Sequence, residues 1–212
     1  MRTPARVRLA ACAIAAVAGL AVPRATAGEL AIEGHAGYFQ MAAENSASAV
    51  FDARGGGTFG GAVRYTFWRA AFVSAGVRTF TKEGERVFVA TPNSTVQKLG
   101  FPLKLRLTPV FLSVGYRFRD GRVIVPYAGM GGSLTSYKEE SEVAGEAFDE
   151  DGSKAGFHGF AGVEVGRGMF RVGAEAGYST VPGGLGLGGV SKVYGEDDLG
   201  GWHTVGKVIV AF

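Results

Sequence analysis

The feature that most constrains this chain is a two-residue alternation of side chains that recurs in eight segments. In each segment, large apolar residues alternate with glycine, other small residues or charged residues, which is typical of a β-strand with two different faces. The segments lie at about 29–41, 58–68, 70–81, 110–118, 123–137, 156–165, 170–179 and 202–212. An all-β fold is therefore expected.

The links between these segments alternate strictly between short and long. Short links lie near Trp68 and Arg69, at 119–122 and at 166–168, and long links span about 42–57, 82–109, 138–155 and 180–201. Membrane barrels have this order, with short periplasmic turns and long external loops. The sequence predicts an eight-stranded antiparallel up-and-down transmembrane β-barrel with both ends of the strand array on the periplasmic side.

Charged residues on the second face of the strands distinguish a barrel from a soluble β-sandwich. They are Arg64, Arg78, Arg117, His158, Glu164, Arg171, Glu175 and Lys207. A sandwich core would bury them at several kcal/mol for each charge, whereas the narrow lumen of a small barrel lets them pair and hydrate. We expect a lumen charge network that plugs the barrel, with Arg171, Glu175 and Glu164 among its pairs. The alternatives are a polar filter or gate, and a sandwich that turns these residues outward.

Aromatic residues gather beside the predicted short turns. They are Tyr65, Phe67, Trp68, Tyr116, Phe118, Tyr127, Phe170 and Phe212. Aromatic rings are favoured where a bilayer meets water, so this set predicts a girdle at the periplasmic interface. Ordinary packing at strand ends is the alternative.

The first 27 residues have the pattern of an export signal. Arg2, Arg6 and Arg8 precede an apolar run from Leu9 to Val22, and Ala25–Ala27 supplies small residues for cleavage before Gly28. We therefore expect a cleaved signal peptide at 1–27 and a barrel at 28–212. A lipoprotein signal ending at Cys12 is the alternative, but there the apolar run follows the cysteine instead of preceding it.

Removal of this signal changes the charge of the chain and leaves it without a thiol. The loss of Arg2, Arg6, Arg8 and Arg24 leaves 18 basic against 19 acidic residues, a formal net charge of −1. The basic character thus belongs to the precursor, and nucleic acid is not an expected partner. The only cysteine leaves with the signal, which excludes disulfides and thiolate metal sites. No cofactor is expected.

Acidic residues are concentrated in one predicted long loop. Those considered for cation binding are Glu139, Glu140, Glu142, Asp149 and Asp151. Oxygen-rich loops bind Ca²⁺, but this one lacks EF-hand spacing, and a solvated acidic loop is the competing interpretation. Gly55–Gly60 and Gly184–Gly189 each match a nucleotide-binding glycine pattern, but neither lies between a strand and a helix.

The segment before the fourth predicted strand alternates in the opposite phase. Leu103, Leu105 and Leu107 alternate with Lys104 and Arg106, which predicts a bulge near Thr108 and Pro109. We expect Val87–Ala90 and Leu103–Leu107 to extend a hairpin above the membrane. Lys104 and Arg106 would then meet lipopolysaccharide phosphates.

Several glycine- and aromatic-rich motifs carry a family resemblance. They are Tyr116-Arg117-Phe118, Pro126–Gly132, Gly159–Glu164 and Gly173–Tyr178, and the chain ends Val208-Ile209-Val210-Ala211-Phe212. Residues 28–212 resemble the outer-membrane β-barrel domain family, which includes outer membrane proteins W, X and A. The ending, with Val208, Val210 and Phe212, resembles the signal that the barrel assembly machinery reads. The resemblance implies a Gram-negative outer-membrane location, with membrane lipid, lipopolysaccharide, assembly machinery and periplasmic chaperones as partners.

The family name does not choose a function, so three remain open. The leading hypothesis is a non-enzymatic barrel that supports envelope structure or passes small apolar solutes laterally, as relatives of outer membrane protein W are thought to do. The alternative is a surface adhesion or interaction barrel acting through its external loops. The third is a lipid A-modifying enzyme. Lipid A deacylases of this architecture carry His-x-Ser, but Phe160 stands two residues after His158, so no catalytic residue is assigned.

Overall fold

The structure is a computed structural model that describes residues 28–68, 70–92, 94–118, 123–143, 146–183 and 189–212. Eight antiparallel strands close into a barrel in the order in which they follow in the chain. The elements are β1 (Glu29–Met41), α2 (Glu44–Phe51), β2 (Gly55–Phe67), β3 (Ala71–Phe88), β4 (Gln97–Arg117), β5 (Ile124–Val143), β6 (Glu146–Arg167), β7 (Phe170–Thr180), α3 (Gly189–Tyr194) and β8 (Gly201–Ala211). The predicted fold class is confirmed.

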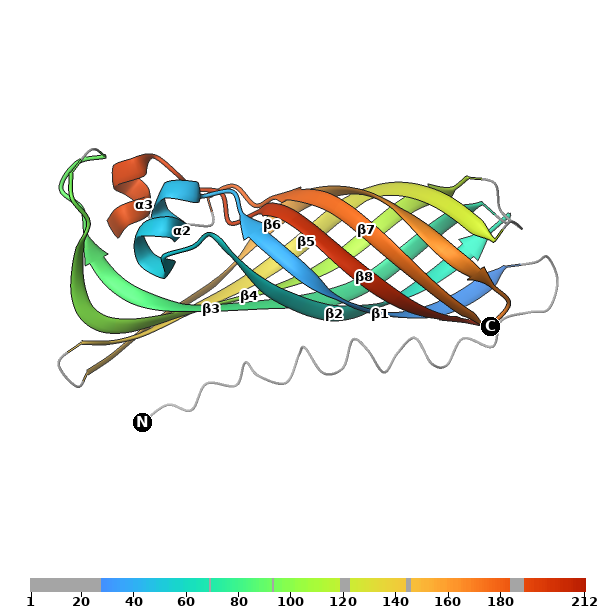
Figure 1. The fold of residues 1–212 in the computed structure, drawn as a ribbon, viewed down its shortest axis with the longest axis horizontal. Helices are drawn as coiled ribbons and strands as arrows, with labels where there is room; N and C mark the ends of the chain where they lie inside the picture. The colour runs from blue at the N-terminus through green and yellow to red at the C-terminus, as the bar shows by residue number, and fades with distance from the viewer. Residues whose placement is uncertain (1–27, 69, 93, 119–122, 144–145, 184–188) are drawn as a thin grey trace.

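The two ends of the barrel differ, as expected from the link lengths (Figure 1). The end where β2–β3, β4–β5 and β6–β7 connect by short turns, with the C-terminus beside them, is called the short-turn end. At the opposite, loop end, α2 and α3 lie side by side, and β3 to β6 extend beyond the other strands. The expected loops at 82–109 and 138–155 are therefore mostly paired strands, because β3 and β4 run to Phe88 and Gln97, and β5 and β6 to Val143 and Glu146.

Side chains on the outer face form an apolar belt. Leu112, Val114, Met130, Val172 and Val208 are each at least half exposed to the surroundings of the barrel. A soluble protein rarely exposes so large a continuous apolar surface, whereas a bilayer favours it. No helix in the described part of the chain is long and apolar enough to cross a bilayer.

The aromatic residues beside the short turns lie on this outer face, with one exception. Trp68, Tyr116, Phe118, Phe170 and Phe212 are exposed there, and Tyr65 and Phe67 are half-buried. Tyr127 is a correction, because it is buried inside the barrel and its hydroxyl donates to Glu175. The odd-numbered residues of β5 face inward, but glycines in this strand hide the alternation from which that could be predicted.

No bulge lies near Thr108 and Pro109, contrary to prediction. The β3–β4 register is the same on both sides of these residues and shifts only between Glu85 and Val87. Leu103, Leu105 and Leu107 continue the inward-facing phase of Ser113 and Arg117, and all are buried. The apparent change of phase arises because the inward-facing residues of β4 change from polar to apolar along the strand. The expected signal peptide, the 119–122 turn and most of Gly184–Gly189 lie outside the described residues.

Candidate functional site

The interior near the short-turn end is filled by charged side chains. Arg171 donates to Glu29 at 2.8 Å, and Arg117 contacts both Glu29 and Glu164 at 3.3 Å. Glu164 also accepts from Arg64. Arg64 and Glu164 are 2% and 1% exposed, so the bore is closed by paired charges at this level.

The same network continues toward the loop end through Glu33. Arg64 lies 3.1 Å from Glu33, and Lys207 lies 3.1 Å from Glu33 and 2.5 Å from Glu175. Glu175 also accepts from the Tyr127 hydroxyl at 3.0 Å, and Arg78 lies 3.8 Å from it. We call this continuous set, from Arg171 to Arg78, the lumen network. Each member therefore contacts at least one oppositely charged neighbour, which buried charges require.

All eight residues of the expected network point into the barrel, but their pairing differs from expectation. Arg171 pairs with Glu29 and Glu164 and not with Glu175. Sequence reasoning left out four carboxylate or imidazole side chains that face the interior beside this network, Glu29, Glu33, His35 and His203. Glu29, Glu33 and His35 lie an even number of residues from the buried Ala31 on β1, and His203 lies four residues before Lys207 on β8. The period-two pattern therefore places all four on the inner face.

His158 contacts a serine and not the ion pairs. Its Nε2 lies 2.7 Å from the Ser113 hydroxyl, although β5 runs between their strands. The intervening residue is Gly131, where a Cβ would lie 2.9 Å from the imidazole of His158. The absent side chain lets the two groups meet. A serine and a histidine in contact resemble part of a hydrolase site, but this pair faces the barrel interior and no orienting third group contacts the imidazole among the described residues.

A cavity of about 80 Å³ lies above the lumen network, and we call it the chamber. Arg78, His35 and His203 line its polar side, and Phe39, Phe80 and Leu107 line its apolar side. At roughly 10–15 Å³ for each water position, this volume holds several waters or one small organic molecule.

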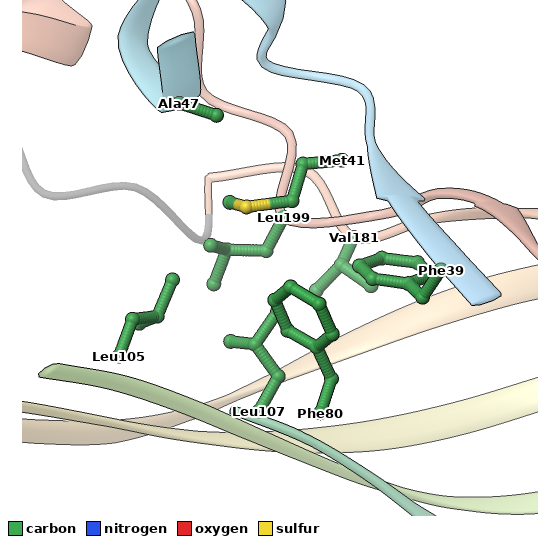
Figure 2. Close-up of a cluster of buried hydrophobic side chains, with 8 residues drawn as sticks. All are labelled: Phe39, Met41, Ala47, Phe80, Leu105, Leu107, Val181 and Leu199. Carbon is green, nitrogen blue, oxygen red and sulfur yellow. The ribbon is translucent and has the colours of Figure 1, made fainter. Parts of the chain in front are cut away.

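An apolar cluster closes the chamber toward the loop end (Figure 2). Its buried members are Phe39, Met41, Ala47, Phe80, Leu105, Leu107, Val181 and Leu199. The rings of Phe39 and Phe80 meet edge to face, with their centroids 5.0 Å apart. Ala47 belongs to α2, and Val181 and Leu199 belong to the β7–β8 connection, so the cluster joins the loops to the barrel wall.

The carboxylate of Glu196, in the β7–β8 connection, joins that connection to α2 by hydrogen bonds. Glu196 accepts from the backbone N–H groups of Asn45 and Ser46 at 3.0 and 2.8 Å, and from both side chains. Burial opposes ionisation of Glu196, but these hydrogen bonds outweigh it and hold its pKa below the usual value. α2 is therefore held over the chamber by the β7–β8 connection.

The acidic residues considered for cation binding lie on the paired strands β5 and β6. Glu140 pairs with Asp149 across the strands, and Lys138 contacts both of them, at 3.6 Å in the case of Asp149. Glu139 is half-buried on the inner face, where burial raises its pKa. Glu142 and Asp151 are exposed. No group of three or more metal-ligating side chains is assembled in the described part of the chain.

The wall beside the chamber has a gap in its strand pairing. Besides the register shift between Glu85 and Val87, the pairing of β3 with β4 is interrupted at Arg78 and Thr79, opposite Pro109 and Thr108. The N–H of Arg117 donates toward β3, to Ala70 at 2.7 Å, so odd-numbered residues of β4 direct their backbone groups to β3. Pro109 has no N–H to donate, and the ladder loses a bond there.

The residues that end the chain face outward. Val208 and Phe212 are 59% and 66% exposed, and Val210 is half-buried. Val208 and Val210 pair with β1 and β7, which places them in the closing seam of the barrel. Their recognition by assembly machinery stays a prediction.

Comparison with known proteins gives structural neighbours only. No family model and no curated sequence matches the chain. A major outer membrane protein of Thermus thermophilus is 11% identical, with a TM-score of 0.60 over 88% of this chain and 100% of that chain. The outer membrane protein OprG of Pseudomonas aeruginosa is 14% identical, with a TM-score of 0.57 over 88% of this chain and 97% of that chain. With its closed ring of eight strands, this chain has the fold of the outer-membrane β-barrel proteins.

Proposed function

We propose that this protein is a non-enzymatic barrel of a Gram-negative outer membrane that passes a small, largely apolar solute sideways into the bilayer. The observation that carries the proposal is the gap in the β3–β4 ladder at Pro109, next to the chamber. The solute would enter at the loop end, occupy the chamber and leave between β3 and β4.

Movement straight through the bore is opposed by the lumen network. An eight-stranded barrel is just wide enough to be filled by side chains. Arg64 and Glu164, which are almost fully buried, occupy the centre below the chamber. Opening that path would separate buried ion pairs, which costs several kcal/mol. We therefore expect low ionic conductance.

The sideways path meets weaker resistance. The backbone bonds of β3 and β4 are interrupted beside the chamber, and the outer face of the same strands presents Val77 and Val110 to lipid. A solute leaving here exchanges the apolar side of the chamber for the apolar belt. An apolar molecule that leaves the apolar side of the chamber by this path passes directly to lipid, as the hydrophobic effect favours.

This proposal includes the location and orientation of the barrel. The apolar belt would lie in the outer membrane, with the loop end outside and the short-turn end in the periplasm. Residues 1–27 would direct export and be removed. Lys104 and Arg106 lie on the outward face of β4 beyond the belt, which is the position of lipopolysaccharide phosphates. The assembly machinery and periplasmic chaperones would act on the chain before it folds.

A reversible staple across the gap tests the proposal. The register on either side of the gap places Thr79 opposite Thr108. Thr79→Cys with Thr108→Cys would therefore form a disulfide across the gap between β3 and β4, here called the seam staple. The control staple is Ser136→Cys with Ser153→Cys, whose hydroxyls lie 3.1 Å apart between β5 and β6. Uptake of radiolabelled toluene by cells producing each variant is measured with and without reductant.

The seam staple is expected to lower uptake to the level of cells lacking the protein, and reductant is expected to restore it. The control staple leaves uptake unchanged. Equal uptake with the seam staple open and closed would overturn sideways passage.

A second candidate is surface interaction, which the projecting strands of β3 to β6 favour. Their outer face beyond the belt carries Glu83, Lys104, Arg106 and Lys138, suited to a polar partner. Adhesion that falls when these hairpins are shortened, with toluene uptake unchanged, would support this role in place of transport.

A further inference from the structure

The chamber has two chemically different sides, although an apolar solute needs only one. Phe39, Phe80 and Leu107 offer apolar surface toward the loop end. Toward the lumen network, the chamber is lined by three imidazoles and by five charged side chains of the network. These are His35, His158 and His203, with Glu33, Arg64, Arg78, Glu175 and Lys207. Placing a purely apolar molecule here would leave buried polar groups without partners, which opposes binding.

Charges in the lumen network do not balance. It contains five cations, Arg64, Arg78, Arg117, Arg171 and Lys207, and four carboxylates, Glu29, Glu33, Glu164 and Glu175. One positive charge is therefore in excess within this set of described residues.

The excess lies at Arg78. Its nearest carboxylate in the network is Glu175 at 3.8 Å, and Lys207 holds that same group at 2.5 Å. Each other cation of the network has a carboxylate within 3.3 Å. Arg78 also lines the chamber and lies opposite Pro109 at the gap. Of the three network cations that line the chamber, Arg64, Arg78 and Lys207, Arg78 is thus the least neutralised.

Two buried histidines next to Arg78 have polar atoms to spare. His203 is 4% exposed, and neither ring nitrogen makes a hydrogen bond within the described structure, with Glu175 at 3.7 Å. His35 is 5% exposed, its Nε2 lies 3.5 Å from Nε of Arg78, and its Nδ1 has no partner there. Both line the chamber. An imidazole N–H beside a guanidinium is a good donor set for one carboxylate.

We infer that the chamber binds a short apolar monocarboxylate, with its carboxylate on Arg78 and the histidines and its chain among Phe39, Phe80 and Leu107. This inference rests on the proposed passage of a solute through the chamber and names its chemical class. A single negative charge neutralises the excess cation. A dicarboxylate is disfavoured, because its second carboxylate would lie either in the apolar cluster or beside the negative charge of Glu175.

The test is an amide NMR titration of the full-length folded barrel in lipid nanodiscs with pentanoate and with 1-pentanol. The two probes share a chain length and differ in the carboxylate. Wild-type protein is expected to bind pentanoate more tightly, with shifts at residues that line the chamber. Arg78→Gln is expected to weaken pentanoate by about tenfold or more, the effect of losing one charge-assisted hydrogen bond, and to leave 1-pentanol unchanged.

Two further variants keep the test decisive. Arg78→Lys retains the charge and is expected to keep part of the preference. Arg171→Gln removes a cation that does not line the chamber, and pentanoate binding is expected to stay as in the wild type. Glu175 keeps Lys207 and Tyr127 in the Arg78 variants, so the barrel is expected to fold.

The outcomes separate the two proposals. If neither probe binds wild-type protein, the proposed passage fails. If both bind equally and Arg78→Gln changes neither, the chamber accepts solute but the carboxylate site is wrong. If Arg171→Gln weakens pentanoate as much as Arg78→Gln, the general charge of the lumen and not Arg78 attracts it, which also overturns the site.

Discussion

Neutralising Glu164 tests whether the lumen network holds the barrel together. Glu164 lies on β6 and reaches three guanidinium groups, those of Arg64, Arg117 and Arg171. It is 1% exposed, and water cannot replace it as a partner. Glu164→Gln keeps the size of the side chain and removes its charge, so the effect reports the electrostatic contribution.

The magnitude follows from the charges that remain. Within the described residues of the network, five cations face four carboxylates, and the substitution leaves three carboxylates, with Arg64 left to share Glu33 with Lys207. Removing one partner of a buried ion pair costs about 3–5 kcal/mol, because the other charge stays desolvated and unpaired. We expect Glu164→Gln to lower the free energy of unfolding by about that amount.

The assay is equilibrium unfolding in urea with the barrel in lipid vesicles, followed by the fluorescence of Trp68 and Trp202, the only tryptophans in the chain. The control is Glu83→Gln, which removes the carboxylate of an exposed pair with Lys104 at 2.9 Å. An exposed pair contributes about 0–1 kcal/mol. If Glu164→Gln destabilises no more than Glu83→Gln, the network is a hydrated set of charges and the argument from burial is wrong.

Two further predictions follow from the outer face and the loops. Leu112→Arg, on the lipid-facing side of β4 and 59% exposed, is expected to destabilise the barrel by about 2–4 kcal/mol in vesicles, whereas Arg106→Leu beyond the belt stays within about 0.5 kcal/mol in the same urea assay. Equal effects would contradict the position of the belt. The lowered pKa of Glu196 means that its contribution is complete above the usual value of 4.5 and is lost as pH falls through its folded value. The protection factors of the amides in residues 44–51, which correct for the intrinsic pH dependence of exchange, are therefore expected to fall as pH is lowered through that value, and Glu196→Gln is expected to lower them at pH 7. Unchanged exchange in both cases would show that other contacts hold α2.

Strand order and the facing of the strands could be predicted from the sequence, because a period of two assigns every second residue to the same face. Arg64, Glu164 and Lys207 were assigned to the interior on that basis alone, and each is buried or nearly so. Tyr127 was misplaced because Gly129 and Gly131 have no side chain to mark a face. A glycine-rich strand leaves its phase undefined until its neighbours fix the register.

Pairing inside the barrel could not be predicted in the same way. Alternation places Arg171 and Glu175 on one face of β7, four residues apart, yet Arg171 pairs with Glu29 from β1. Contacts across the lumen depend on strand tilt and register, which no single strand encodes. The Ser113–His158 contact spans a third strand and depends on the missing side chain of Gly131.

The opposite phase of Leu103–Leu107 predicts a bulge only if each face of a strand keeps the same polarity along its whole length. Cross-strand rows show otherwise. On the outer face, Val110 pairs with Leu134, then Thr108 with Ser136, then Arg106 with Lys138. Over the same length, the inner face of β4 changes from Arg117 and Ser113 to Leu107 and Leu105, which are all buried. Both faces reverse together because the surroundings do: where lipid ends and water begins outside, the interior must supply the apolar core that holds the loops. The row of Thr108 and Ser136 therefore marks the level at which the outer face changes from apolar to polar.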